Sequence, residues 1–278
     1  MKTIVDDTRP NILKEQFVPD HVFIYLAGGA IRVFDGNKTY TFKAGNACIA
    51  RKNTLAKYEL LDSKNAFEPI LFCFDEPFLQ YFQKKNNLEQ VDGILKESFI
   101  RVKQSEWIVS FIQSIKPYYK GVMQLEDAFE DVKYEELLLI LLKNQPELAA
   151  VLFEYRKPGK IDLEEFMNRN YKFNVSIERF AFLTGRSVSA FKRDFKQQFN
   201  DTPNRWLVKR RLREAYFLLK KNNKKPSEVY LDLGFETLSH FSYAFKRQFG
   251  LTPTALTSRE AEAPLTPSSP NKLLKKLP

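Results

Sequence analysis

The apolar positions in the first half of the chain fall into short runs separated by turn residues. These runs are rich in β-branched and aromatic residues, and they predict strands at 22–26, 31–34, 39–42, 47–50, 55–61 and 70–74. Asp35-Gly36 stands between two of the runs and is a strong signal for a tight hairpin. Many short strands at this spacing predict a small β-barrel or sandwich.

A helical pattern replaces these runs from Glu76 onwards. It predicts helices at 77–85, 92–103, 106–115, 134–143 and 146–153. Residues 137–142 are all apolar, so we expect the helix at 134–143 to be buried on most of its faces. The polar stretch RKPGK at 156–160 then predicts a linker, because Pro and Gly interrupt regular structure.

The second half of the chain contains a repeat with an offset of fifty residues. Residues 176–203 align with 226–253 without a gap, and both segments end in Thr-Pro. Each copy predicts two short helices on either side of a turn that contains Gly, at 176–183 and 187–198 and again at 226–233 and 237–248. Two short helices joined by such a turn are typical of a helix-turn-helix, whose second helix enters the major groove of DNA.

The second helix of each copy has one apolar and one polar face. Ser187 and Thr237 are suitable N-caps for these two helices. The apolar stripes follow helical spacing and consist of Val188, Phe191, Phe195 and Phe199, and of Leu238, Phe241, Phe245 and Phe249. The opposite faces carry Ser189, Lys192, Arg193, Lys196 and Gln197, and Ser239, His240, Tyr243, Lys246 and Arg247. Base readout and phosphate neutralisation need such groups. A single face of this kind would fit an ordinary solvated helix, whereas two equivalent ones favour DNA binding.

A long helix is predicted between the two copies, at 203–221. Thr202 is a suitable N-cap, and Pro203 suits the first helical position. Lys209, Arg210, Arg211 and Arg213 mark a basic side of this helix. A helix of about twenty residues spans roughly 30 Å. Two helix-turn-helix units joined by it could therefore reach major-groove segments about one turn of DNA (~34 Å) apart.

Charge separates the two halves of this 278-residue chain. Residues 1–155 contain 19 Lys and Arg against 22 Asp and Glu, whereas residues 156–258 contain 21 against 10. The net charge of +10 therefore comes from the helical segment. A basic excess confined to one segment indicates a polyanionic partner for that segment, and nucleic acid is the simplest candidate.

The composition argues against a metal site, an enzyme and a membrane protein. The chain has two His and two Cys, too few for a disulfide framework or a His-built metal site, so we expect no metal, no cofactor and no enzymatic activity. No run of 18 apolar residues occurs, and the N-terminal segment lacks the apolar core of a signal peptide. We therefore expect a cytoplasmic protein without membrane contact.

These features together resemble the AraC/XylS family of bacterial transcription regulators. The resemblance covers about residues 160–256 and rests on LTGRSVSAFKRDFKQQF (183–199), DTPNRWLVKRRLREAYFLL (201–219) and LGFETLSHFSYAFKRQFGLTP (233–253). Residues 1–155 resemble, more weakly, the cupin-like β-barrel and helices of the family's regulatory half, closest to its type III secretion activator branch. The implied fold is α+β: a small β-barrel with following helices at 1–155, a linker at 156–160, and an all-α domain of two helix-turn-helix units joined by a long helix at 161–257. The Pro- and Ser-rich residues 258–278 are expected to be a disordered tail.

The resemblance also implies which residues contact DNA. Base contacts are implied for Ser189, Lys192, Arg193, Ser239, His240 and Tyr243. Phosphate contacts are implied for Arg186, Ser187, Lys196, Thr237, Lys246 and Arg247. Tyr243 stands where many relatives carry Arg, so we expect the second helix-turn-helix to read guanine less than the first. The residues after Pro253 also depart from the family's usual ending of an aromatic residue followed by Arg.

The family implies duplex DNA as the partner of the second half and RNA polymerase as a further one. For the first half it implies an effector, either a small molecule or a protein, and often a homodimer. The sequence does not choose among these, nor between activation and repression. Cys48 and Cys73 stand among apolar strand residues and are expected to be buried and inert, with a thiol sensor as the open alternative. A separate hypothesis is an adaptor whose basic half contacts an acidic protein.

Overall fold

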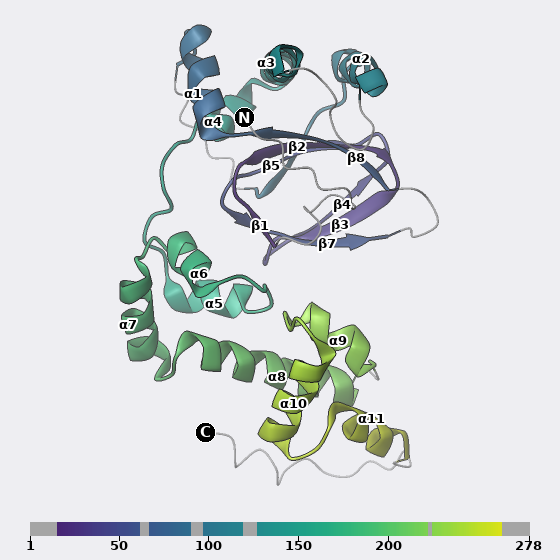
Figure 1. The fold of residues 1–278 in the computed structure, drawn as a ribbon, viewed down its shortest axis with the longest axis vertical. Helices are drawn as coiled ribbons and strands as arrows, with labels where there is room; N and C mark the ends of the chain where they lie inside the picture. Colours follow the sequence, from purple (N-terminus) through teal and green to yellow (C-terminus); the bar gives the residue numbers. More distant parts are fainter. Residues whose placement is uncertain (1–15, 62–66, 90–96, 119–126, 222–223, 263–278) are drawn as a thin grey trace. The chain divides into compact units, whose positions relative to one another are not determined.

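The computed structural model describes residues 16–61, 67–89, 97–118, 127–221 and 224–262 (Figure 1). Contacts between residues divide the chain into two compact units, the first ending at Gln198 and the second beginning at Phe199. The first unit contains the β-rich half together with the first helix-turn-helix. The second unit contains the long connecting helix and the second helix-turn-helix. The expected linker at 156–160 is an irregular segment inside the first unit.

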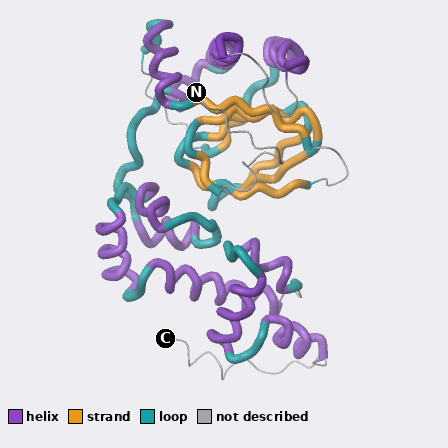
Figure 2. The backbone as a smooth tube through the Cα atoms, in the orientation of Figure 1, coloured by secondary structure: helices purple, strands orange, loops and turns teal. Residues whose placement is uncertain are grey.

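Two sheets face each other in the first unit and form the predicted barrel-like structure (Figure 2). One sheet has the order β8-β2-β5-β9, the second has the order β4-β3-β7, and β1 pairs with β6. The paired strands are antiparallel. The strands are β1 Phe17–Val18, β2 His21–Gly28, β3 Ala30–Phe34, β4 Thr39–Lys43, β5 Ala47–Ala50, β6 Thr54–Leu55, β7 Lys57–Leu60, β8 Glu68–Phe74 and β9 Phe99–Arg101.

Successive residues of β2 point to two different hydrophobic cores. Val22, Ile24 and Leu26 belong to the cluster between the sheets, which also contains Val33 and Phe99. Phe23, one position away, belongs to a second cluster on the outer side of the same sheet. This division follows from the two-residue period of a strand. Because both faces of β2 are buried, its sequence is almost continuously apolar.

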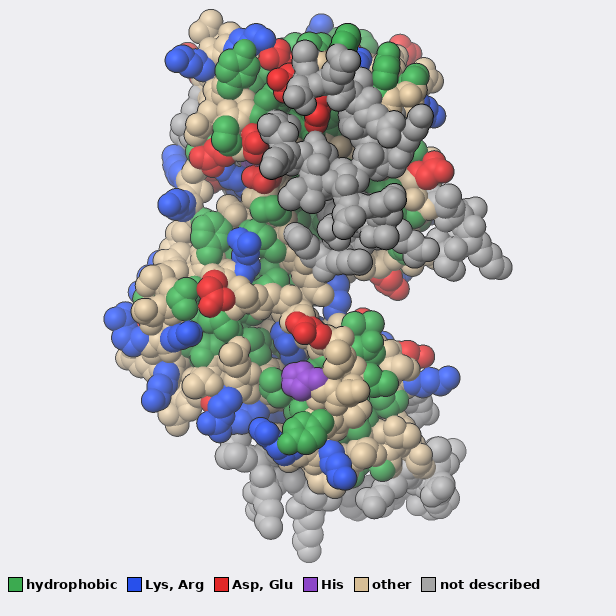
Figure 3. Space-filling model, in the orientation of Figure 1, with side chains coloured by type: hydrophobic (Ala, Val, Ile, Leu, Met, Phe, Trp, Pro, Cys, Tyr) green, Lys and Arg blue, Asp and Glu red, His purple; other side chains and the backbone are tan. Residues whose placement is uncertain are grey.

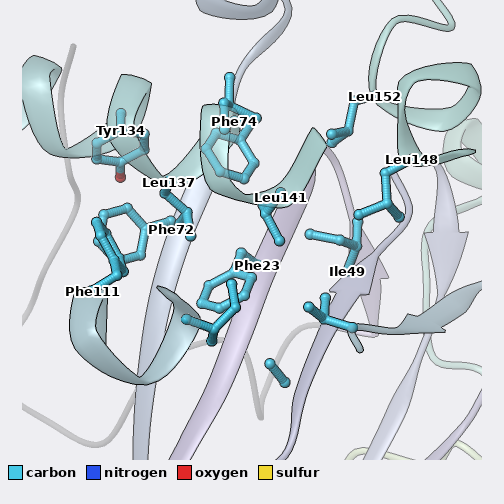
Figure 4. Close-up of a cluster of buried hydrophobic side chains, with 14 of the residues drawn as sticks. Phe23, Ile49, Phe72, Phe74, Phe111, Tyr134, Leu137, Leu141, Leu148 and Leu152 are labelled. Carbon is cyan, nitrogen blue, oxygen red and sulfur yellow. The ribbon is translucent and has the colours of Figure 1, made fainter. Parts of the chain in front are cut away.

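Helices cover the outer face of the sheet that contains β2 (Figure 1). Figure 4 shows how Leu137 and Leu141 of α3 approach Phe23 and Phe72 of the sheet. Within the expected range 134–143, every position except Leu139 and Lys143 is buried or half-buried, whereas Val132, earlier in the same helix, is exposed. The helical segments here are α1 Glu76–Lys85, α2 Glu106–Ile115, the 3-10 turn η2 Lys116–Tyr118, α3 Asp127–Asn144, the 3-10 turn η3 Pro146–Leu148 and α4 Ala149–Leu152.

Two sequence predictions in this unit are wrong. The helix expected at 92–103 is replaced by β9, which pairs with β5 through Ile49 and Ile100; residues 90–96 lie outside the described part of the chain. The strand expected at 55–61 is broken at Ala56 into β6 and β7, which pair with different partners. Both errors concern pairings between residues far apart in the sequence, which a local pattern does not contain.

The Asp35-Gly36 hairpin packs against the start of the first helix-turn-helix region. The ring of Phe34 stacks on that of Phe173, with centroids 6.0 Å apart. Gly36 has a φ of +96°, and a Cβ added there would lie 2.3 Å from Oδ1 of Asn170, at the end of α5 (Leu163–Asn170). A second contact places the guanidinium of Arg179 over the ring of Phe17 at 3.6 Å. These contacts explain why the first helix-turn-helix belongs to the same compact unit as the strands.

The second unit is helical and has its own core. It consists of α8 Pro203–Lys221, α9 Pro226–Asp232, α10 Leu238–Phe249 and α11 Pro253–Glu262. Leu212, Ala215 and Leu219 of α8 pack against Phe241 and Phe245 of α10 in this core. α8 has the bounds expected from the sequence. α11 continues past residue 257, so the disordered tail predicted from residue 258 is wrong for 258–262, and 263–278 lie outside the described residues.

Candidate nucleic-acid interface

The first helix-turn-helix consists of α6 (Ile177–Leu183), a turn, and its recognition helix α7 (Val188–Phe199). The hydroxyl of Ser187 accepts a hydrogen bond from the backbone N–H of Ala190 at 3.3 Å, which confirms the predicted N-cap. Phe191 and Phe195 are buried, with ring centroids 5.6 Å apart. They fix the apolar face of α7 inward and leave its opposite face exposed.

The second helix-turn-helix repeats this construction with α9 and its recognition helix α10. The hydroxyl of Thr237 accepts from the backbone N–H of His240 at 3.1 Å, again as the predicted N-cap. Phe241 and Phe245 are buried, and their centroids are also 5.6 Å apart. α10 ends at Phe249 and is capped by Gly250, which has a φ of +78° and therefore the left-handed conformation that glycine adopts most readily.

All residues expected to contact bases lie on exposed surfaces of the two recognition helices. Arg193 is extended toward solvent, with 76% of its side chain exposed, and its guanidinium is 3.1 Å from Oδ1 of Asp194. Tyr243 is 67% exposed on α10. The exposed set is Ser189, Lys192, Arg193, Ser239, His240 and Tyr243.

Most of the expected phosphate contacts are exposed as well. They are Ser187, Lys196, Thr237, Lys246 and Arg247. The two hydroxyls act as acceptors in their N-caps, and each still has a proton to donate to a phosphate oxygen. Both lie at the start of a recognition helix, where the helix dipole also favours an anion.

Arg186 is placed differently from the other expected phosphate contacts. Only 8% of its side chain is exposed. Its guanidinium donates to Asp194 at 3.2 Å and to the carbonyl oxygens of Ile161 and Thr184 at 2.9 and 2.8 Å. This geometry favours a role in holding the turn of the first helix-turn-helix over a direct phosphate contact.

Leu238 is a candidate that the sequence analysis placed in the core. It begins α10 directly after the N-cap Thr237 and is 40% exposed. Its equivalent in the first copy, Val188, is half-buried. The N-terminal part of a recognition helix meets base edges, and an aliphatic side chain there can contact the methyl group of thymine. A hydrophobic stripe alone could not reveal this exposure, because Leu238 has the spacing of a core residue.

The connecting helix α8 has a less uniform basic side than its sequence predicts. Arg211 is buried, and its guanidinium donates to the carbonyl oxygen of Gly234 at 2.8 Å. Lys209 pairs with Asp201 at 2.7 Å. Among the charged side chains visible on the C-terminal helices, Lys and Arg nevertheless predominate over Asp and Glu (Figure 3).

The other chemistry-bearing residues of the first unit are dispersed. His21 is buried, and burial lowers its pKa to about 3. Cys48 is buried, which raises its pKa to about 12, whereas Cys73 is exposed on the face of β8 opposite Phe72 and is not the buried thiol that we expected. Among the residues that the structure describes, no three His, Cys, Asp or Glu side chains are grouped to hold a metal ion. The described helices include none that is long and apolar enough to cross a membrane.

Two family models match this chain, one in each half. The model of the ExsA N-terminal regulatory domain matches residues 21–151, and that of a helix-turn-helix domain matches residues 180–259. The chain belongs to the AraC/XylS family. As a member of this family it is a DNA-binding transcription regulator with an N-terminal regulatory domain, and the adaptor hypothesis is set aside.

Individual relatives of this AraC/XylS regulator match it over most of its length. The transcriptional activator RhaS of Enterobacter sp. (strain 638) is 26% identical over 87% of this chain and 88% of its own. The transcriptional regulator ExsA of Pseudomonas aeruginosa is 23% identical over 82% and 83%. The virulence regulon transcriptional activator VirF of Yersinia enterocolitica is 29% identical over 84% and 88%. These relatives are transcription regulators, and neither family model describes a catalytic domain.

Proposed function

We propose that the regulator binds duplex DNA with two recognition helices, α7 and α10, each in one of two successive major grooves. The observation that carries this proposal is the internal repeat: each recognition helix has a buried pair of Phe rings on one face and exposed polar or cationic residues on the other. α8 has 19 residues and is therefore about 28 Å long. That length suits recognition segments about one turn of DNA (~34 Å) apart.

The two recognition helices have different chemistry and are proposed to read different bases. Lys192 and Arg193 can donate to guanine O6 and N7, which is a common specific contact. α10 offers Ser239, His240, Tyr243 and the exposed apolar Leu238 instead. We therefore assign guanine recognition mainly to α7, and recognition by single hydrogen bonds and methyl contact to α10.

Alanine variants in the full-length protein test these assignments by gel shift with bound genomic fragments. Lys192→Ala or Arg193→Ala should cost about 1–3 kcal/mol of binding free energy, concentrated at particular base pairs. Lys246→Ala should weaken binding to all sequences alike and reduce the slope of log K against log salt by about 1. If Arg193→Ala left binding to every fragment unchanged, α7 would not read bases as proposed.

The regulatory half is proposed to dimerise and to receive an effector, either a small molecule or a protein. The dimer proposal is supported by an exposed apolar face on α3, which contains Phe129, Val132 and Leu139. Trp107 of α2 lies beside the end of this face, and the centroid of its ring is 4.2 Å from the ammonium nitrogen of Lys143. Exposed apolar patches on soluble domains commonly mark interfaces. The further partners proposed for the whole protein are duplex DNA and RNA polymerase at the promoter, and its proposed location is the cytoplasm.

Sedimentation of the full chain tests the dimer directly. Val132→Lys together with Leu139→Lys should shift a dimer to monomer, because two charges would face the partner's apolar surface. The paired control is Lys43→Glu on β4, a charge change in the sheet that α3 does not cover, which should leave the sedimentation coefficient unchanged. A wild-type chain that sediments as a monomer at all concentrations would contradict the assignment.

A further inference from the structure

Asp194, in the middle of the first recognition helix, connects three basic residues. Its Oδ2 accepts from Nε of Arg186 at 3.2 Å and lies 4.0 Å from Nζ of Lys160. Its Oδ1 accepts from Nε and Nη2 of Arg193 at 3.3 and 3.1 Å. One carboxylate therefore holds the buried guanidinium of Arg186 with one oxygen and, with the other, the solvent-exposed guanidinium of Arg193, the proposed base contact.

The buried side of this cluster also fixes the end of the linker. Arg186 donates to the carbonyl oxygen of Ile161, just after the linker, and to that of Thr184 in the turn. Gly185, next to it, has a φ of +65°, and a Cβ added there would lie 2.4 Å from the carbonyl carbon of Gly159. The linker backbone thus runs directly over the turn, where a larger residue than glycine would collide with it.

The second helix-turn-helix lacks this cluster, although the repeat gives an equivalent for every position. The residues equivalent to Gly185, Arg186 and Asp194 are Phe235, Glu236 and Ala244. Phe235 is buried and packs edge-on against Phe241. Since the hydrophobic frame is shared by both copies, the charged cluster is an addition specific to the first one.

We propose that Asp194 is a positioning residue for DNA recognition. Its carboxylate holds the guanidinium of Arg193 in one orientation relative to α7. Its contact with Arg186, which also binds the carbonyl oxygen of Ile161, links that orientation to the end of the linker. Arginine has several rotatable bonds, and fixing them before DNA arrives reduces the entropy lost on binding. The inference rests on the proposed role of Arg193 as a base contact. It adds a residue that need not touch DNA and yet affects which base pair is preferred.

The charges of the cluster favour the ionised form of Asp194. Hydrogen bonds from Arg186, and next those from Arg193, lower the pKa of Asp194 below its usual range. A negative charge this close to the DNA-facing surface repels phosphates, so it weakens sequence-independent binding. Loss of the charge should therefore raise affinity for arbitrary DNA while it reduces discrimination, and these opposite effects distinguish positioning from simple loss of structure.

A double-mutant cycle on the full-length protein tests the inference. Wild type, Asp194→Asn, Arg193→Ala and the double variant are titrated with a bound fragment and with its single base-pair substitutions. Asp194→Asn should lower discrimination about three- to tenfold at the base pair that Arg193 reads, and at no other. In the Arg193→Ala background the same change should have no further effect there. Asp194→Glu, which keeps a carboxylate, should restore most of the discrimination.

Control variants separate the alternatives. Glu165→Gln removes an exposed carboxylate from α5 in the same unit, where it pairs with Arg169, and should leave discrimination as in wild type. If Arg193→Ala changes no base preference, the proposed base contact fails. If Arg193→Ala changes one preference but Asp194→Asn does not, the base contact stands and the positioning inference fails. A uniform loss of binding in Asp194→Asn, together with a lower melting temperature, would also overturn the inference in favour of a purely structural role.

Discussion

The guanidinium of Arg211, in the middle of α8, donates a hydrogen bond of 2.8 Å to the carbonyl oxygen of Gly234 in the turn of the second helix-turn-helix. In the first copy the equivalent carbonyl belongs to Thr184, and it accepts from Arg186 at 2.8 Å. Both turns are therefore closed by an arginine, one supplied locally and one by the connecting helix. Arg211 couples the orientation of α8 to the recognition element that follows it.

Replacement of Arg211 by Met should destabilise the second unit. The aliphatic part of the side chain is retained, but the buried carbonyl of Gly234 loses its donor, which costs about 1–3 kcal/mol. Chemical denaturation followed by circular dichroism measures the change. Arg213→Met, at an exposed position of the same helix, is the matched control and should change the free energy of unfolding by less than about 0.5 kcal/mol. Equal effects of the two substitutions would show that the Arg211–Gly234 bond adds no stability.

The exposed Leu238 should make binding depend on the methyl group of a thymine. Replacing that thymine by uracil removes only the methyl group, which should cost wild type about 0.8 kcal/mol, or roughly fourfold in affinity. Leu238→Ala should bind the two DNAs equally, whereas Val188→Ala in the first copy should keep the wild-type difference. Uracil scanning of a bound fragment by gel shift checks this. An identical uracil profile for wild type and Leu238→Ala would contradict it.

Gly36 and Gly45 form a matched pair for testing the contact between the hairpin and α5. Both have positive φ, +96° and +83°, so alanine is conformationally strained at either position. Only at Gly36 would the new Cβ meet a neighbour, at 2.3 Å from Oδ1 of Asn170. Gly36→Ala should therefore lower the free energy of unfolding by about 1–3 kcal/mol more than Gly45→Ala. Equal losses in thermal denaturation would mean that the hairpin does not rest against α5.

The buried His21 should make stability fall in acid. Its pKa is about 3 in the folded chain, lowered by burial and then by the charges of Lys52 and Arg51, and near 6.5 when unfolded. Between these values the unfolded chain binds the extra proton, so stability is complete above pH 6.5 and is lost as the pH falls toward 3, by up to about 1.4 kcal/mol per pH unit. His21→Gln should remove this component. If the unfolding free energies of variant and wild type ran parallel from pH 7 to pH 4, His21 would not be the cause.

Much of the fold follows from local sequence patterns, and the wrong predictions concern strands that pair with residues far away in the sequence. The connecting helix has the predicted bounds because its N-cap, Pro203 and long apolar side are all contained in one segment. The repeat located both recognition helices because Phe spacing fixes which face is buried. By contrast, β9 exists only through its pairing with β5, about fifty residues away in the sequence. Three residues of strand FIR carry no local signal that excludes a helix.

The candidate interface was predictable as a face but not residue by residue. Lys209, Arg210, Arg211 and Arg213 look alike in the sequence, and only the position of the Gly234 carbonyl distinguishes Arg211 as a buried structural residue. Arg186 is likewise largely buried, because its guanidinium donates hydrogen bonds to Ile161, Thr184 and Asp194. Leu238 is the opposite case, because its spacing predicted a core position and the structure exposes it. In each case the deciding partner comes from tertiary packing.

Selection of genomic fragments bound by the purified full-length protein tests the central claim most directly. Sequencing of the retained fragments should return a motif with two conserved segments about 10 bp apart, and enrichment should fall steeply between low and high salt. With Arg193→Ala, conservation should be lost in one segment and retained in the other. No enriched motif, or one continuous motif that Arg193→Ala leaves intact, would contradict the account of two separate recognition helices.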